Sequence, residues 1–223
     1  MKILVKFPTR ERHYKWSKLI RLYIDKASGP VQFMITLDHN DPQLPYYLDT
    51  IKHLSEEGVD ILHYVDVSYG KIYACNRDMD HAIDWDIVVL ASDDMVPVKN
   101  DWDKILIDEM TEHFPDTDGV LFHNDGYLED KLNTMCILGK KYYDRFGFIY
   151  HKSFKSLWCD NLFQDQANKL GKMIYFPEVL FKHEHFSNDV KNAHTRDALM
   201  SINESFYYED KAMYYKLKKE LGL

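Results

Sequence analysis

The chain has 223 residues, of which 45% are hydrophobic and 14% aromatic, a composition typical of a folded globular protein and not of a disordered one. Its 28 basic and 36 acidic residues leave a formal net charge of −8, which argues against non-specific binding to nucleic acid or to anionic membranes. No apolar run approaches the ~20 residues that span a bilayer. The first residues predict a strand and not a signal peptide, and the three separated cysteines favour reduced thiols, so we expect a cytoplasmic protein.

The first half of the chain alternates short apolar runs with longer amphipathic ones. Length and β-branched content predict strands at residues 2–7, 31–37, 60–65, 86–91 and 118–123. The segments between them predict helices at residues 12–28, 45–58, 70–84 and 101–114. This alternation is typical of an α/β fold, in which a mostly parallel sheet is flanked by helices on both faces.

The second half is less regular. Residues 134–154 predict a strand, a short helix and an aromatic-rich loop, and residues 158–172 predict a helix that ends at Gly171. Residues 173–186 predict two strands interrupted by Pro177, the second of which carries two histidines. A helical pattern rich in Tyr and Lys closes the chain. Without an internal repeat or a linker, residues 1–223 are expected to form a single domain.

Several residues, most of them polar, follow the ends of predicted strands. They are Pro8, Thr9 and Arg10 after the first strand, Asp38 after the second, and Asp93 and Asp94 after the fourth. Ligands of open α/β sheets bind beyond the carboxyl ends of the strands. We therefore predict that these residues line one cleft.

The adjacent carboxylates of Asp93 and Asp94 repel each other unless a cation lies between or beside them. Hard oxygen ligands at a strand end suit Mg²⁺ or Mn²⁺, which characteristically bridges a protein carboxylate and a substrate diphosphate. A helix cap or a solvated turn is the structural alternative for such a pair. Neighbouring motifs are needed to decide between the two.

Six short motifs occur along the chain, and their order is more informative than any one of them. They are FPTRER (7–12), Asp38, GKIYACN (70–76), LASDDM (90–95), WCDN (158–161) and FKHEHF (181–186). Together they resemble the nucleotide-sugar-dependent glycosyltransferases of the GT-A fold, especially the large inverting group known as family 2, from residue 2 to about residue 190. The chain differs from that pattern at Ala91, where the family commonly has an acid, and at Asp160-Asn161, where it usually has two acids.

The resemblance implies a GT-A fold, which is Rossmann-like, and a metal-dependent transfer of a sugar to an acceptor hydroxyl with inversion. The donor would be a nucleotide-diphosphate sugar, with a UDP-sugar preferred. Residues 1–125 would bind the nucleotide sugar, and residues 126–223, including the C-terminal helix, would bind the acceptor. That acceptor would be a carbohydrate or another hydroxyl compound, and the acidic net charge disfavours a nucleic acid.

The resemblance also implies a metal site for Mn²⁺ or Mg²⁺. Asp94 is the preferred ligand, and Asp93 would either bind the metal or contact the donor ribose. His183 and His185 are two residues apart, so on a strand their side chains point the same way. A neutral imidazole suits Mn²⁺ better than Mg²⁺. His185 is slightly preferred by its position in the motif.

Asp160 is the candidate general base, taking the proton of the acceptor hydroxyl as that oxygen attacks the anomeric carbon. Its structural alternative is helix capping, and Asp165 is a second candidate base. The donor-binding candidates are Pro8, Thr9, Arg10, Asp38, Lys71, Asn76 and Asp93. Among these, Asp38 would accept hydrogen bonds from the base or ribose, whereas the cations would meet phosphate or remain solvated.

Two other classes of function fit parts of the pattern. A nucleotidyltransferase would share the sheet and the metal, but it usually carries a glycine-rich loop after the first strand, and FPTRERH has no glycine. A non-catalytic nucleotide- or carbohydrate-binding protein of the same fold would keep the cleft without needing Asp160 or the aspartate pair.

Overall fold

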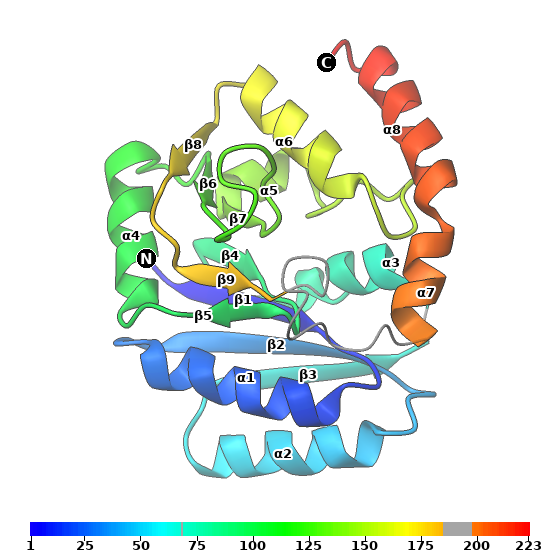
Figure 1. The fold of residues 1–223 in the computed structure, drawn as a ribbon. Helices are drawn as coiled ribbons and strands as arrows, with labels where there is room; N and C mark the ends of the chain where they lie inside the picture. The colour runs from blue at the N-terminus through cyan, green and yellow to red at the C-terminus, as the bar shows by residue number, and fades with distance from the viewer. Residues whose placement is uncertain (68, 185–197) are drawn as a thin grey trace.

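The computed structural model describes residues 1–67, 69–184 and 198–223 (Figure 1). Within these residues the main sheet has the strand order β3-β2-β1-β4-β7-β6-β8. Its strands are β1 (Ile3–Pro8), β2 (Val31–Asp38), β3 (Ile61–Asp66), β4 (Ile87–Leu90), β6 (Val120–His123), β7 (Ile137–Gly139) and β8 (Met173–Phe176). The helices are α1 (His13–Lys26), α2 (Leu44–Glu56), α3 (Lys71–Asn76), α4 (Trp102–His113), α5 (Lys140–Phe146), α6 (Cys159–Lys169), α7 (Ala198–Ser205) and α8 (Tyr207–Glu220).

The sheet is mixed and mostly parallel. Strand β7 runs antiparallel to both β4 and β6, and the other neighbouring pairs are parallel. Consequently β1, β2, β4 and β6 all end at the same edge. The fold class expected from the sequence, a single α/β domain with a mostly parallel sheet flanked by helices, is confirmed.

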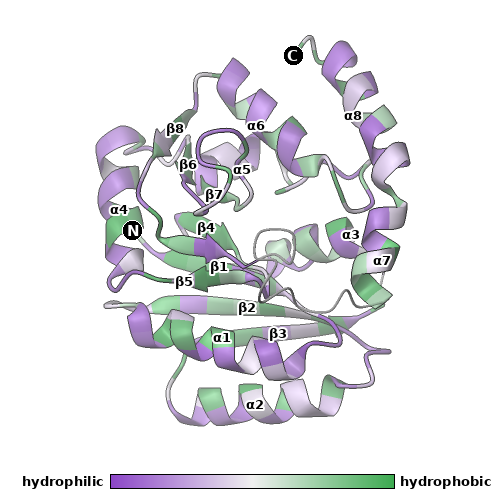
Figure 2. Cartoon of the chain, in the orientation of Figure 1, coloured by the Kyte–Doolittle hydropathy of each residue, from purple (hydrophilic) through white to green (hydrophobic). Residues whose placement is uncertain are grey.

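Helices cover both faces of the sheet. Successive residues of a strand point to opposite faces, so each central strand contributes to two cores. On β1, Ile3, Val5 and Phe7 face a core shared with α1, α2 and α4. Leu4 faces the second core, which includes α3, α5, α6 and α8. Figure 2 shows the central strands mainly in hydrophobic colours, whereas α1 and α2 mix hydrophobic and hydrophilic faces.

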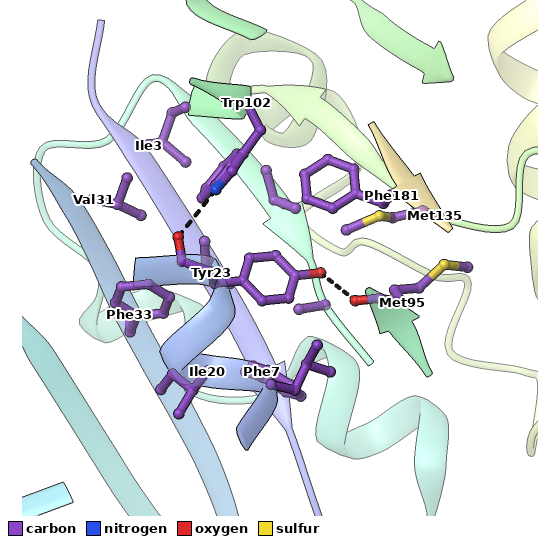
Figure 3. Close-up of a cluster of buried hydrophobic side chains, with 14 of the residues drawn as sticks. Ile3, Phe7, Ile20, Tyr23, Val31, Phe33, Met95, Trp102, Met135 and Phe181 are labelled. Carbon is purple, nitrogen blue, oxygen red and sulfur yellow. Dashed lines mark hydrogen bonds between the residues drawn. The ribbon is translucent and has the colours of Figure 1, made fainter. Parts of the chain in front are cut away.

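A short two-stranded ribbon, β5 (Met95–Pro97) paired with β9 (Phe181–His183), lies beside the main sheet. In its antiparallel register Met95 is opposite His183. Tyr23 of α1 anchors both strands: its hydroxyl donates to the Met95 carbonyl at 2.9 Å, and its ring stacks on Phe181 with centroids 5.6 Å apart (Figure 3). The α1 core thus fixes where the two strands meet.

Two features differ from the sequence-based expectation. Strand β5 was not predicted, because three residues that pair with a segment over 80 positions away carry no local signal. The helix predicted at 70–84 is α3 followed by a 3-10 turn, Met79–His81. It breaks because Arg77 is extended and Asp78 adopts a left-handed conformation with φ of 69°. Among the described residues no helix is both long and apolar enough to cross a membrane.

Candidate functional site

The residues at the ends of β1 and β2 lie side by side, as expected of parallel strands whose carboxyl ends meet at one edge of the sheet. Pro8 pairs with Thr36, and the Thr9 amide donates to the Thr36 carbonyl at 3.1 Å. The Thr9 hydroxyl is 3.0 Å from the hydroxyl of Tyr47 on α2. This part of the edge is therefore held by α2 as well as by the sheet.

Asp38, the last residue of β2, lies between two guanidinium groups. Nη1 of Arg10 donates to its Oδ2 at 3.1 Å, and Nη1 of Arg77 is 3.7 Å from its Oδ1. Asp38 and Arg77 are both buried. The two guanidinium groups offset the cost of burying the Asp38 carboxylate and hold it in place at this edge.

Asp93 pairs with Arg12 of the loop before α1. Nη1 of Arg12 donates to both carboxylate oxygens, at 2.9 and 2.8 Å. The sequence pattern singled out Arg10 in this loop, whereas the structure brings Arg12 to the aspartate pair. Asp93 and Asp94 thus have different neighbours, and the repulsion expected between them is reduced by a cation on Asp93.

Asp94 faces the ribbon. Its Oδ2 is 3.6 Å from Nε2 of His183, and its Oδ1 accepts a hydrogen bond from Ser92. Its carbonyl accepts the Glu184 amide at 2.7 Å, so the backbone ties the end of β9 to the aspartate. Burial acts to raise the pKa of Asp94, but His183, Ser92 and Lys15 outweigh it and hold that pKa well below its usual range.

Asp125 lies behind His183 and fixes its ring. Its Oδ2 is 3.3 Å from Nδ1 of His183 and accepts the Thr134 hydroxyl at 3.0 Å, while Oδ1 accepts the amides of Tyr127 and Leu128. With Nδ1 turned to Asp125, Nε2 points towards Asp94. Burial disfavours the imidazolium, but the two carboxylates outweigh it and raise the pKa of His183 to about 9.

Lys71 and Asp160 belong to the same electrostatic neighbourhood. Lys71, the first residue of α3, is exposed to solvent. Desolvation lowers its pKa, but the acidic groups of Cys159 and Cys75, and after them Asp94 and Asp160, raise it overall. Burial raises the pKa of Asp160, and the charges of Lys71 and His183 act against it. The charges of Lys71 and Asp160 therefore act on each other and on the Asp94–His183 pair, although the four residues are distant in sequence.

Asp160 lies in the first turn of α6, and its Oδ1 accepts the amide of Asn161 at 2.9 Å. Backbone amides are its hydrogen-bond partners, and no side chain of the described residues competes for it, which suits a group that must accept a proton. The other candidate base, Asp165, instead accepts hydrogen bonds from Tyr214 at 2.7 Å and Lys218 at 2.6 Å of α8. These contacts give Asp165 a structural partner and favour Asp160.

Two of the residues predicted to form the site remain, Asn76 and His185. Asn76 uses its side chain to join the end of α3 to the loop after α5, because its Nδ2 donates to the Tyr150 carbonyl at 2.7 Å and its Oδ1 accepts the Ile149 and Tyr150 amides. Contact with a donor stays a prediction for Asn76. His185 lies outside the described residues, so of the two histidines the structure describes His183.

The residues present fit a divalent cation. A carboxylate oxygen and an imidazole nitrogen 3.6 Å apart are spaced like neighbouring ligands of one ion, and Asp125 supplies the hydrogen-bonded carboxylate that metal-binding histidines usually have. No group of three or more His, Cys, Asp or Glu in the described ranges is arranged to hold a metal. Two protein ligands agree with Mg²⁺-type sites, in which substrate phosphates and water complete the shell.

Sequence reasoning missed Arg12 and Asp125. Asp125 follows β6, whose end lies at the same sheet edge as those of β1, β2 and β4, so the strand-end rule alone could have found it. Arg12 stands two residues beyond Arg10 in the same loop. Only the tertiary structure distinguishes which of the two arginines reaches Asp93.

Comparison with solved structures identifies the fold. The mannosyltransferase PcManGT from Pyrobaculum calidifontis, in complex with GDP-Man and Mn²⁺, superposes with a TM-score of 0.65 at 12% identity, covering 98% of this chain and 75% of that chain. TarS 1–349 from S. aureus, in complex with UDP-GlcNAc, gives a TM-score of 0.62 at 15% identity, covering 82% of this chain. The chain spans 58% of that TarS structure.

No protein-family model matches the sequence, and no curated protein matches it. TM-scores of 0.65 and 0.62 establish a common fold, and at 12 to 15% identity the reaction has to be argued from the site. The sheet order, the single domain and these superpositions agree: the chain has the mixed, mostly parallel, Rossmann-like architecture of the GT-A fold.

Proposed function

We propose that the protein is a metal-dependent, inverting glycosyltransferase of the family-2 type, which moves a sugar from a nucleotide-diphosphate sugar to an acceptor hydroxyl. The observation that carries this proposal is the pair Asp94 and His183, which lies at the ligand-binding edge of a GT-A sheet in the same electrostatic neighbourhood as Asp160. A UDP-sugar is the preferred donor. The solved structures of this fold include complexes with both GDP-Man and UDP-GlcNAc, so both nucleotides belong in the test.

Asp94 and His183 would hold Mn²⁺ or Mg²⁺, with His183 kept in place by Asp125. The bound cation would act as a Lewis acid that neutralises the charge developing on the diphosphate leaving group. The charge of Asp94 acts on Lys71, whose ammonium would add positive charge at the same diphosphate. Arg12 holds Asp93 in a fixed position, from which its carboxylate would meet the donor ribose.

The other end of the donor belongs to Thr9, Arg10 and Asp38. Asp38 would accept hydrogen bonds from the base or ribose, and Arg10 keeps that carboxylate oriented. In this division residues 1–125 bind the nucleotide sugar. Residues 126–223 would bind the acceptor, and they also supply His183 to the donor side.

Asp160 would take the proton from the acceptor hydroxyl while its oxygen attacks the anomeric carbon from the face opposite the diphosphate. A carboxylate whose pKa is raised by burial is a stronger base than a solvated one, and the positive charge of Lys71 opposes that rise. A single displacement of this kind inverts the anomeric configuration.

A donor screen tests the proposal. The protein is incubated with UDP-, GDP- and dTDP-sugars, with and without Mn²⁺, and both thermal shift and release of the free nucleotide are measured. We expect one nucleotide class to stabilise the protein only with Mn²⁺ and to be slowly hydrolysed. No binding of any nucleotide sugar in the presence of Mn²⁺ would overturn the proposal.

The variant Asp160→Asn separates binding from chemistry. It is expected to bind the donor and Mn²⁺ like the wild type while losing transfer by roughly 10²- to 10⁴-fold, the usual contribution of a general base. Unchanged transfer would remove Asp160 from the mechanism. Donor binding without transfer even in the wild type, whatever the acceptor, would point to the non-catalytic binding protein.

A further inference from the structure

Asp210 is a carboxylate with no exposed surface, located in the first turn of α8. It accepts three backbone amides from one loop: Lys155 on Oδ1 at 2.9 Å, and Ser156 and Leu157 on Oδ2 at 2.9 and 2.8 Å. A buried carboxylate is tolerated where several N–H groups replace its water. The C-terminal helix therefore holds this loop by its main chain, whatever side chains the loop carries.

The held loop leads directly into the candidate base. Trp158 follows it in a left-handed conformation with φ of 61°, α6 begins at Cys159, and Asp160 is the second residue of that helix. A left-handed conformation is costly for a tryptophan and persists only where its surroundings fix the chain on both sides. Asp210 supplies that fixation on one side, and α6 on the other.

Helix α8 is also joined to α6 farther along. Tyr214 and Lys218 both donate to Asp165, and Nζ of Lys169 donates to the Leu221 carbonyl at 2.6 Å. These contacts lie on the body and end of α6, away from its first turn. Removing one of these contacts should therefore weaken the attachment of α8 to α6 without releasing residues 155–157.

We propose that Asp210 is a positioning residue for the transfer reaction, holding residues 155–157 so that the first turn of α6 presents Asp160 to the acceptor hydroxyl. The inference rests on the proposed function, in which Asp160 is the base. It assigns α8 the placement of the base, in addition to its packing and to the acceptor binding proposed for residues 126–223. Nothing in it requires Asp210 to touch a substrate.

The test compares Asp210→Asn with Lys218→Met. The amide of Asp210→Asn keeps the shape but cannot accept all three amides, because its NH₂ group faces N–H donors. We expect kcat to fall about 10- to 100-fold, as small displacements of a catalytic group cause, with the donor KM changed by less than about twofold. Lys218→Met should unfold at a lower temperature and keep the wild-type kcat.

Equal kcat values for Asp210→Asn and the wild type would overturn the inference, as would an equal fall in Lys218→Met. Amide hydrogen exchange on the wild type covers the case in which Asp210→Asn does not fold: the Lys155, Ser156 and Leu157 amides should be strongly protected, and rapid exchange there would contradict the hydrogen bonds. Exchange does not depend on turnover, so protected amides in a protein without transferase activity would refute the proposed function and leave the loop attachment standing.

Discussion

The edge formed by β1, β2 and β4 and the ribbon formed by β5 and β9 contribute to the same site in different ways. At the edge, neighbouring parallel strands bring Thr9, Arg10 and Asp38 together, because Thr9 and Arg10 come just after β1 and Asp38 ends β2. In the ribbon, Asp94 meets His183 because two three-residue strands pair across more than 80 positions. The edge is a property of the sheet, whereas the ribbon depends on Tyr23 and the α1 core. We expect the edge to determine which nucleotide binds, and the ribbon to determine whether metal-dependent chemistry occurs.

The adjacent aspartates allow the two regions to be tested separately, since Asp93 pairs with Arg12 and Asp94 with His183 of the ribbon. Asp94→Ala should lower metal-dependent transfer on the order of a thousandfold, because several kcal/mol of leaving-group stabilisation are lost. Asp93→Ala should cost much less and act mainly on the donor KM. Steady-state kinetics at saturating Mn²⁺ measures both, and a larger loss of kcat in Asp93→Ala would reverse the assignment.

Asp125 and Asp41 form a matched pair of buried carboxylates, one behind the ribbon and one at the edge. Asp125 holds His183, whereas Asp41 accepts the Glu11 and Gln43 amides, each at 2.7 Å. Asp125→Asn should weaken Mn²⁺ binding roughly 10- to 100-fold, as loss of such a supporting carboxylate usually does. Asp41→Asn should leave Mn²⁺ affinity unchanged. Titration of Mn²⁺ followed by calorimetry distinguishes them, and equal affinities in the two variants would show that Asp125 does not support the metal ligand.

The pH dependence of activity tests whether the positive charge of Lys71 acts on the candidate base, Asp160. Burial raises the pKa of Asp160, and the positive charge of Lys71 lowers it. The base must be ionised, so activity is lost as the pH falls through that pKa. Removing the cation in Lys71→Met leaves the raising effect of burial less opposed, and the acidic limb of the kcat profile should move to higher pH. A limb that stays in place or moves to lower pH would show that Lys71 does not act on the base.

The smallest effect concerns how the ribbon is anchored. Tyr23→Phe removes a buried hydrogen bond and leaves the Met95 carbonyl without that donor, which should lower the free energy of unfolding by about 1–3 kcal/mol. Tyr14→Phe is the control on the same helix, since Tyr14 is 73% exposed, and should change stability by less than about 0.5 kcal/mol. Denaturant unfolding measures both, and equal stabilities would mean that the Tyr23 hydroxyl does not secure β5.

The two regions also differ in how much of each could be predicted from the sequence. Strand-end rules predicted that Thr9, Asp38 and the aspartate pair would share an edge, and periodicity predicted most helices to within a few residues. Neither rule could pair Met95 with His183, because register between distant short strands is decided by the packing around Tyr23 and Phe181. Asp210 escaped for the same reason: in sequence it is an ordinary acid at the start of a helix.

The central claim is that Asp94 and His183 hold one cation together with the donor diphosphate. A double-mutant cycle with Asp94→Asn, His183→Gln and the combined variant, measuring Mn²⁺-dependent binding of the nucleotide found in the donor screen, tests it most directly. We expect each single variant to lose roughly tenfold or more of the Mn²⁺-dependent affinity, and the combined variant to lose clearly less than the product of the two. Losses that multiply, or full Mn²⁺-dependent binding in Asp94→Asn, would contradict the shared site.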